Sequence, residues 1–405
     1  MITDISGRLG MMKTVKERLR VVEEHVKENS ITVMIMGLGS VGTYLLDYLV
    51  SMSDPALKIV VAGRNRAKME SDVNIVRVAA LIRELDKSEI VIEDGVDLTD
   101  TDSVRVAIEK HRPDFIVNSS RAYPGLKYGS ISWSNIRAYG IWTPLAIRFT
   151  KNIMEACETA STDAVVINTS YSDAVIPWLK SAGKASPDLG SGNLNHLVPR
   201  MRFAAAEKLG VSDFWNIDVM FAAGHFHDVC ISKEGQTEGV ELPVKVYYKG
   251  IEQTDIDSAG LYSMCSIPMP TDAKRNMMNA SSNYRIINAV ITAVRTGTQQ
   301  RIFSPGAFGN IGGYPVLIGY GDSGLEARID ESVFGFDEMN RVNRQSMYLD
   351  GVEDVRDGCL YYTDELIDKA KAAFGVRIPK IVSFEDIEKT AEFIIEKIIL
   401  PRTAG

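Results

Sequence analysis

Between residues 31 and 180, short apolar runs alternate with longer segments whose apolar residues recur at helical spacing. The apolar runs are, in order, ITVMIMG, LKIVVAG, EIVIEDG, DFIVNSS and DAVVINTS. Helical segments such as GSVGTYLLDYLVSM, VRVAALIREL, SVRVAIEKH and LAIRFTKNIMEACE lie between them. Apolar strands that alternate with helices are typical of a parallel sheet covered on both faces. The pattern therefore predicts an α/β fold with a doubly wound parallel sheet.

Different patterns flank this region. Within residues 1–30, apolar residues recur at the spacing of an amphipathic helix. These positions are Val15, Leu19, Val22 and Val26. Residues 181–405 mix helical segments such as RMRFAAAEKLG with strand-like segments such as VELPVKVYYKG, which indicates an α+β second domain. We therefore expect three parts, with an N-terminal helix over residues 1–30 and domains over 31–180 and 181–405.

Composition narrows the class of protein. A chain of 405 residues exceeds the usual size of one hydrophobic core. The net charge of −8 disfavours binding to nucleic acid, and the sequence offers neither a secretory signal nor a run long enough to span a bilayer. The cysteines form no CxxC pair, so we expect no metal site and a reducing, cytoplasmic environment. They are Cys157, Cys230, Cys265 and Cys359.

A glycine motif follows the first apolar run. Gly37, Gly39 and Gly42 have the spacing GxGxxG in the segment VMIMGLGSVGTYLL. The first glycine permits a tight turn, the second lets the backbone approach a pyrophosphate, and the third lets helix and strand pack closely. Ser40 and Val41 begin the next helix, whose N-terminus favours phosphate binding. The motif predicts that the first domain is a dinucleotide-binding Rossmann domain.

The end of the second strand indicates which coenzyme is bound. An NAD site usually carries an acid here for the ribose 2′-hydroxyl, whereas this chain has Gly63, Arg64 and Asn65. A guanidinium binds a 2′-phosphate that an acid would repel, so we expect NADP, with NAD as the alternative. Ser119 and Ser120, which follow the fourth strand, are further candidates for coenzyme binding.

At several points in order, residues 31–340 resemble the lactate/malate dehydrogenase family. The segment VVINTSYSDAVIPWLKSAG, with Asn168, resembles the family's strand, asparagine-proline pair and helix. The segment GNLNHLVPRMRFAAAEKLGV resembles the helix with the substrate-binding arginine, here Arg200. The segment AAGHFHD resembles the family's catalytic histidine segment, here with His225 and His227. The resemblance implies a Rossmann fold, a nicotinamide coenzyme and hydride transfer, with Asn168 positioning a ligand.

The sequence also departs from the family pattern. Thr169 stands where the family has proline. If Arg200 is the substrate arginine, Leu197 occupies the place of the aspartate that pairs with the catalytic histidine, and His196 lies nearby but out of frame. The two histidines of GHFHD fall on either side of the family position, which holds Phe226. These departures indicate a distant relative with altered chemistry.

The histidines suit acid–base chemistry. Hydride transfer to a carbonyl requires a proton donor, and an imidazole has a pKa near neutrality. If the segment continues an extended strand, His225 and His227 face the same side and both line one pocket, with Asp228 available to orient one of them. We prefer His225, which directly follows Gly224, although a purely structural histidine pair is the alternative. Arg200 is the candidate anchor for a carboxylate.

The long segment SSRAYPGLKYGSISWSNIRAYGIWTP follows the fourth strand. Its glycines, serines and aromatic residues are typical of a loop that covers a cofactor site. Arg121 and Arg137 within it are candidates for substrate contact, or are simply solvated.

These observations favour an NADP-dependent oxidoreductase that acts on a carbonyl/alcohol pair, such as a 2-oxo or 2-hydroxy acid. The candidate catalytic residues are His225, His227, Arg200, Asn168 and His196. One alternative is a hydrolase like the NAD-dependent family 4 glycosidases, which share this fold but hold a metal through a Cys-Asn-x-Pro run that is absent here. Another is a coenzyme-binding sensor or scaffold without turnover. We expect a small-molecule substrate, no nucleic-acid or membrane partner, and a homo-oligomer.

Overall fold

The computed structural model describes residues 12–403 except 193 and 323. Six parallel strands form the central sheet, in the order β3-β2-β1-β4-β5-β6. Their bounds are β1 (Ile31–Met36), β2 (Leu57–Ala62), β3 (Glu89–Glu93), β4 (Phe115–Asn118), β5 (Val165–Asn168) and β6 (Leu189–Gly190). The strand order reverses between β1 and β4, which is where such sheets bind ligands at the carboxyl ends of their strands. The predicted doubly wound parallel sheet is confirmed.

Alternate residues of each strand face opposite sides of the sheet, so the sheet has two cores. In β1, Val33 and Ile35 belong to one buried cluster, and Met34 and Met36 belong to the other. The first cluster includes α2 (Ser40–Val50), α3 (Arg66–Ile82) and α11 (Asn276–Thr296). The second includes α4 (Thr101–His111), α6 (Thr143–Thr159) and α7 (Ser172–Ser181). Burial on both faces explains why the strands are continuous apolar runs rather than alternating ones.

The expected N-terminal helix is α1 (Val15–Lys27). Thr14 and Glu17 form a capping box at its start, which satisfies backbone N–H groups that would otherwise lack partners. Leu19, Val22 and Val26 are buried against the body of the protein. Arg18 on the same face forms a buried ion pair with Asp188, which ties α1 to the loop before β6.

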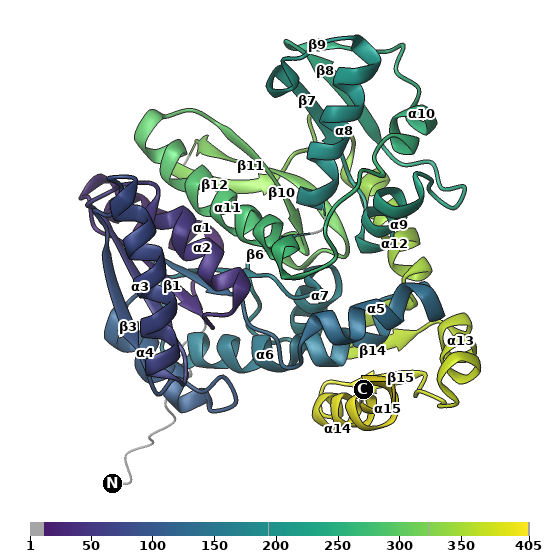
Figure 1. The fold of residues 1–405 in the computed structure, drawn as a ribbon, viewed down its shortest axis with the longest axis horizontal. Helices are drawn as coiled ribbons and strands as arrows, with labels where there is room; N and C mark the ends of the chain where they lie inside the picture. The colour runs from purple at the N-terminus through teal and green to yellow at the C-terminus, as the bar shows by residue number, and fades with distance from the viewer. Residues whose placement is uncertain (1–11, 193, 323, 404–405) are drawn as a thin grey trace, which may run out of the picture.

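Helices and three antiparallel sheets make up the rest of the chain (Figure 1). The sheets are β7 (Ile217–Phe221), β8 (Val244–Tyr248) and β9 (Ile251–Glu252); β10 (Gln300–Pro305), β11 (Gly313–Gly321) and β12 (Gly324–Ile329); and β13 (Val352–Arg356), β14 (Cys359–Tyr362) and β15 (Ile381–Ser383). The helices are α5 (Gly125–Asn135), α8 (Leu194–Leu209), α9 (His225–Glu234), α10 (Ser258–Ser263), α12 (Phe336–Leu349), α13 (Asp364–Phe374), α14 (Ile387–Ile394) and α15 (Leu400–Thr403). This confirms the expected α+β region.

The C-terminal elements do not form a separate core. Leu366 of α13 and Ile387 of α14 belong to the same buried cluster as Met34 of the central sheet. Figure 1 shows β14, β15 and α13, drawn in yellow-green to yellow, near α5 and away from the sheet edge at β3. The strand β6 also lies beyond residue 180 while pairing with β5. Among the described residues, no helix is long and apolar enough to cross a bilayer.

Candidate functional site

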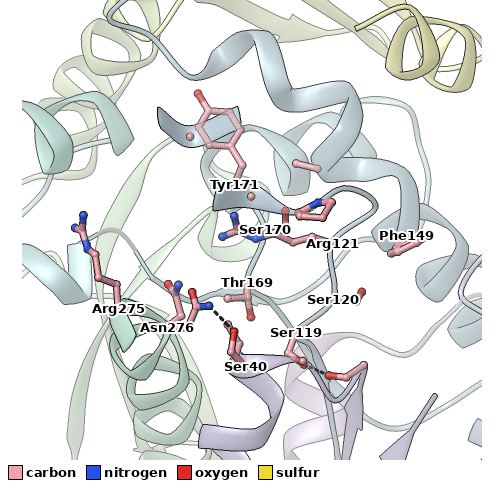
Figure 2. A pocket seen from close by; sticks show the side chains of 18 of the residues that line it. Ser40, Ser119, Ser120, Arg121, Phe149, Thr169, Ser170, Tyr171, Arg275 and Asn276 are labelled. Atoms are coloured by element: carbon pink, nitrogen blue, oxygen red, sulfur yellow. Dashed lines mark hydrogen bonds between the residues drawn. The ribbon is translucent and has the colours of Figure 1, made fainter. Parts of the chain in front are cut away.

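A cavity of about 1000 Å³ lies at the carboxyl ends of β1, β2, β4 and β5. The glycine loop after β1 lines one part of it, and α8, α9 and the start of α11 line another. Figure 2 shows Thr169, Ser170 and Tyr171 on the segment above Ser40, with Arg275 approaching from the helix on the left. The cavity therefore joins the predicted coenzyme site to the part of the chain in which the sequence placed the substrate.

The glycine loop has the geometry that the motif predicts. Gly37 has a φ of +91°, which favours glycine, and a Cβ atom on Gly42 would lie 2.5 Å from the Gly37 carbonyl oxygen. Gly39 has no heavy atom within 4 Å of the place where its Cβ would be, so its backbone borders open space in the cavity. No side chain caps the N-terminus of α2. The loop thus offers an open cradle and unshared N–H groups that fit a pyrophosphate.

Most of the candidate coenzyme-binding residues line this cavity. They are Gly37, Gly39, Ser40, Val41, Gly63, Arg64, Asn65, Ser119 and Ser120. Gly42 does not line it and serves the close packing between α2 and the loop. Ser119 holds the turn, because its Oγ donates a hydrogen bond of 2.7 Å to the Gly37 carbonyl oxygen (Figure 2). Ser40 accepts a hydrogen bond from Asn276, which joins the first helix of the sheet to α11.

After the end of β2, the side chains of Arg64 and Arg66 lie in different surroundings. Arg64 lines the cavity with 72% of its side chain exposed, and its Nη1 lies 3.6 Å from the Asp97 carboxylate. Arg66 does not line the cavity and forms ion pairs with Glu70 and Asp94. Hydrogen bonds from Thr99 hold the pKa of Asp97 below its usual value. Arg64 is thus the arginine available to a coenzyme.

The segment GHFHD forms the start of a helix, so the expected continuation of the strand is wrong. Gly224 is the N-cap of α9, and His225 is its first residue. A Cβ atom on Gly224 would lie 2.8 Å from Ser346 Oγ, so the tight approach of α12 requires glycine at this turn. Residues two apart on a helix point roughly 200° away from each other. His225 therefore lines the cavity, whereas His227 does not.

His225 is held by an aspartate from a distant part of the chain. Its Nδ1 lies 2.8 Å from Asp350 Oδ2, at the C-cap of α12. The same carboxylate accepts hydrogen bonds from the Tyr171 hydroxyl at 2.6 Å and from the Tyr139 backbone N–H at 2.7 Å. The rings of both tyrosines meet the imidazole edge to face, with centroids 4.8 Å and 5.0 Å away. These contacts fix the orientation of the imidazole.

The three candidate histidines differ in charge. Burial lowers the pKa of His225, but the carboxylates of Asp350, Asp173 and Asp228 together outweigh burial, and the pKa is raised above its ordinary value. Burial lowers the pKa of His227 to about 4, and its Nε2 lies 3.2 Å from the Thr237 carbonyl oxygen. Burial and the Arg275 guanidinium lower the pKa of His196, which lines the cavity, to about 3. Of the three, His225 is the histidine that both lines the cavity and has a raised pKa.

Arg200 and Asn168 have different surroundings. Arg200 is 3% exposed and lines the cavity. Its Nη1 donates a hydrogen bond to the Cys265 carbonyl oxygen, and its Nη2 contacts Met269 Sδ. Its Nε has no hydrogen-bond partner. Asn168 is fully buried and does not line the cavity. Its amide accepts hydrogen bonds from two side chains and donates to Ser170 and Ser172. In this structure the amide holds the turn after β5 and does not border the cavity into which we expected it to point.

The two arginines predicted to contact the substrate, Arg121 and Arg137, lie in different places. Arg121 lines the cavity, whereas Arg137 forms ion pairs with Glu234 and Glu238 outside it. These two carboxylates and Cys230 are the one group among the described residues with the spacing of a metal site. Because Arg137 already pairs with both carboxylates, the group is an ion-pair network that ties the end of α5 to α9.

Asp350 was not predicted from the sequence. Leu197 occupies the place of the expected acid, and Asp228 was the acid expected to orient one of the histidines. Asp350 lies 125 residues after His225 and beyond the region of family resemblance. It has no local motif that marks it. Two further residues that line the cavity, Lys233 and Arg275, carry no sequence signal for a ligand either.

Comparisons with known proteins support the fold. No family model matches the chain, and no curated protein matches it. Malate dehydrogenase from Aeropyrum pernix is similar in structure, with 16% identity, a TM-score of 0.51, and coverage of 78% of this chain and 97% of that one. Malate dehydrogenase from Picrophilus torridus gives 16% identity, a TM-score of 0.51, and coverage of 78% and 94%. The chain therefore has the fold of the malate dehydrogenases, as its distant resemblance to the lactate/malate dehydrogenase family implied.

Proposed function

We propose that the protein is an NADP-dependent oxidoreductase that interconverts an alcohol and a carbonyl compound in a substrate that also carries a carboxylate. The observation that carries this proposal is that one cavity is lined by both the open glycine cradle and His225, the histidine that Asp350 holds from behind. The resemblance in fold to malate dehydrogenases is consistent with it. The nicotinamide of the coenzyme would accept hydride from the alcohol carbon or return it to the carbonyl carbon.

The protein side chains would manage the proton and the substrate. Because Asp350 holds Nδ1 of His225, Nε2 is the nitrogen left for the substrate oxygen. In alcohol oxidation, Nε2 takes the hydroxyl proton while hydride leaves the same carbon, and Asp350 stabilises the resulting imidazolium. In carbonyl reduction, the imidazolium returns that proton to the oxygen. Arg200 would hold the substrate carboxylate through its remaining N–H groups.

Arg64 is the basis for proposing NADP rather than NAD. It stands at the end of β2 on the cavity wall, where the ribose of a dinucleotide lies in folds of this kind. Lys68, one turn further along α3, also lines the cavity. Lys68 is already paired with Asp72, so the Arg64 guanidinium is the group that fits a 2′-phosphate, and the neighbouring Asp97 would orient it.

Substitution of His225 tests the proposal. We expect His225→Gln to lower turnover by about 10²–10⁴-fold, because general acid–base catalysis typically contributes that much. NADPH affinity, measured by titration of coenzyme fluorescence, should stay unchanged. His227→Gln is the matched control, because His227 lies on the same helix but away from the cavity. Full turnover in His225→Gln with a panel of hydroxy and oxo acids would show that this histidine is not the proton carrier.

We also infer that the protein is a homo-oligomer in the cytoplasm. Ile75, Val78 and Ile82 form an exposed apolar row along α3 at helical spacing, with 63%, 54% and 80% exposure. Such a row is a candidate for burial against a second copy. Light scattering of the purified protein would measure the mass in solution, and a monomer at micromolar concentration would contradict this inference.

A further inference from the structure

Three cationic side chains surround the end of the cavity near His225. Arg200, Lys233 and Arg275 all line it, and in the described part of the chain none of them is ion-paired with a carboxylate. Burial, followed by the charge of Arg275, lowers the pKa of Lys233. Figure 2 shows Arg275 beside Asn276, where the chain enters α11. Unpaired cations that crowd together in a partly buried cavity favour an anionic ligand.

An acid lies on the same wall. Asp228 is 7% exposed and lines the cavity, and its Oδ1 has no hydrogen-bond partner. It stands three residues after His225 on α9, so the two side chains are neighbours on one face of the helix. Burial raises the pKa of Asp228 to about 7, against the charges of His225 and Arg200. Ser232, one turn further, also has an unpartnered buried Oγ that faces this wall.

A hydroxy acid without an amino group offers no partner for the Asp228 carboxyl group. Its carboxylate would lie among the cations close to Asp228, and ionised Asp228 would repel it. The unpartnered Asp228 oxygen would then remain buried, which is costly for a carboxylate. A substrate with an ammonium group beside its carboxylate removes both problems, because it presents opposite charges to Arg200 and Asp228 at once.

We propose that the substrate is a hydroxy amino acid, with its hydroxyl at His225, its carboxylate at Arg200 and its ammonium group at Asp228. This inference rests on the proposed function and assigns its substrate class. It also explains why His225 and Asp228 lie one turn apart on the same face of α9, because the two side chains would bind two neighbouring polar groups of one small molecule. Asp228 then acts as a residue that discriminates against acids without an amino group.

Matched pairs of acids test the assignment. L-threonine and 3-hydroxybutyrate differ only in the ammonium group, as do L-homoserine and 4-hydroxybutyrate. Calorimetry would measure the binding of each acid to the protein saturated with NADPH. In at least one pair we expect the amino acid to bind at least about tenfold more tightly, since a hydrogen bond to a charged group contributes roughly 1.5–3 kcal/mol. Asp228→Asn should reduce that difference to within about twofold, because the neutral amide no longer attracts the ammonium group.

The controls separate this inference from the proposed function. Asp228→Asn should keep the thermal midpoint and the NADPH affinity of the native protein. Glu338 is an exposed acid on α12, and Glu338→Gln should keep the preference for the amino acid. If the native protein binds no coenzyme, the proposed function fails. If it binds coenzyme but prefers the amino acid in neither pair, or binds none of the four acids, only the substrate assignment fails. A loss of NADPH affinity in Asp228→Asn would also overturn it.

Discussion

Nδ1 of His225 lies 2.8 Å from Oδ2 of Asp350, although 125 residues separate them in the chain. The acid stands at the C-cap of α12, and the histidine is the first residue of α9. The pairing of these two helix ends creates the one candidate histidine that lines the cavity and has a raised pKa. Asp350 therefore supplies this histidine with an acidic partner, whereas Leu197 on α8 has no charge to offer.

Removal of the Asp350 charge should reduce turnover without removing the coenzyme site. We expect Asp350→Asn to lower kcat/KM by about 10²–10⁴-fold, because the imidazolium formed in alcohol oxidation loses its counter-charge. Steady-state kinetics with the best hydroxy acid substrate would measure this, and NADPH titration should give an unchanged affinity. Glu353→Gln, a neighbouring acid paired with Lys380 on the surface, is the matched control. Equal losses in both variants would contradict a specific role for Asp350.

The rate should depend on pH in opposite ways in the two directions. Alcohol oxidation needs neutral His225, so its rate should rise with pH and level off above the raised pKa of this group. Carbonyl reduction needs the protonated form, so its rate should fall over the same range. Initial rates measured from pH 5 to 9 would show both limbs. Asp350→Asn should move both limbs to lower pH, because Asp350 is the main charge that opposes the lowering of the His225 pKa by burial.

His227 should make folding stability sensitive to acid. Its pKa is lowered from 6.5 to about 4 in the folded state, so the unfolded chain binds the proton more readily. The contribution of His227 to stability is therefore complete above pH 6.5 and is lost as pH falls toward 4. Urea unfolding at several pH values would measure it. His227→Gln should lose less free energy of unfolding than the native protein between pH 7 and 5, and an identical pH dependence would count against this account.

Alanine substitutions can separate the coenzyme-binding role of the glycine loop from its packing role. Gly39→Ala should leave the thermal midpoint nearly unchanged, because nothing lies within 4 Å of the added Cβ and φ is −92°. It should nevertheless weaken NADPH binding, since the methyl group enters the cradle. Gly42→Ala should lower the midpoint itself, because its Cβ would lie 2.5 Å from the Gly37 carbonyl oxygen. Calorimetric scans and coenzyme titrations of both variants would show whether the effects separate in this way.

Arg64 should govern the choice between the two coenzymes. We expect Arg64→Ala to weaken NADPH binding by roughly ten- to a hundredfold, as the loss of a charge-assisted phosphate contact predicts, while NADH binding changes little. Arg66→Ala is the control, because Arg66 is paired with Glu70 and Asp94 away from the cavity. Equal weakening of both coenzymes in Arg64→Ala would show that this side chain does not recognise a 2′-phosphate.

The expectations from the sequence held where the cause is local. The alternation of apolar strands and helices predicted the parallel sheet, because each element buries its own apolar residues. The glycine spacing predicted the turn geometry, because φ at Gly37 and the packing at Gly42 depend on a few neighbouring residues. The histidine segment was misjudged for the opposite reason. Its apolar run continues from β7, but the close approach of Ser346 turns the chain at Gly224 and starts a helix.

The sequence by itself determined the fold class, the cradle after β1 and the basic residue at the end of β2. Only the tertiary structure decided which histidine faces the cavity, which acid holds it, and that Asn168 is enclosed by its neighbours. The physical reason is that periodicity and turn chemistry act over a few residues, whereas the pairing of His225 with Asp350 depends on how α9 and α12 pack. No pattern within either segment contains that information.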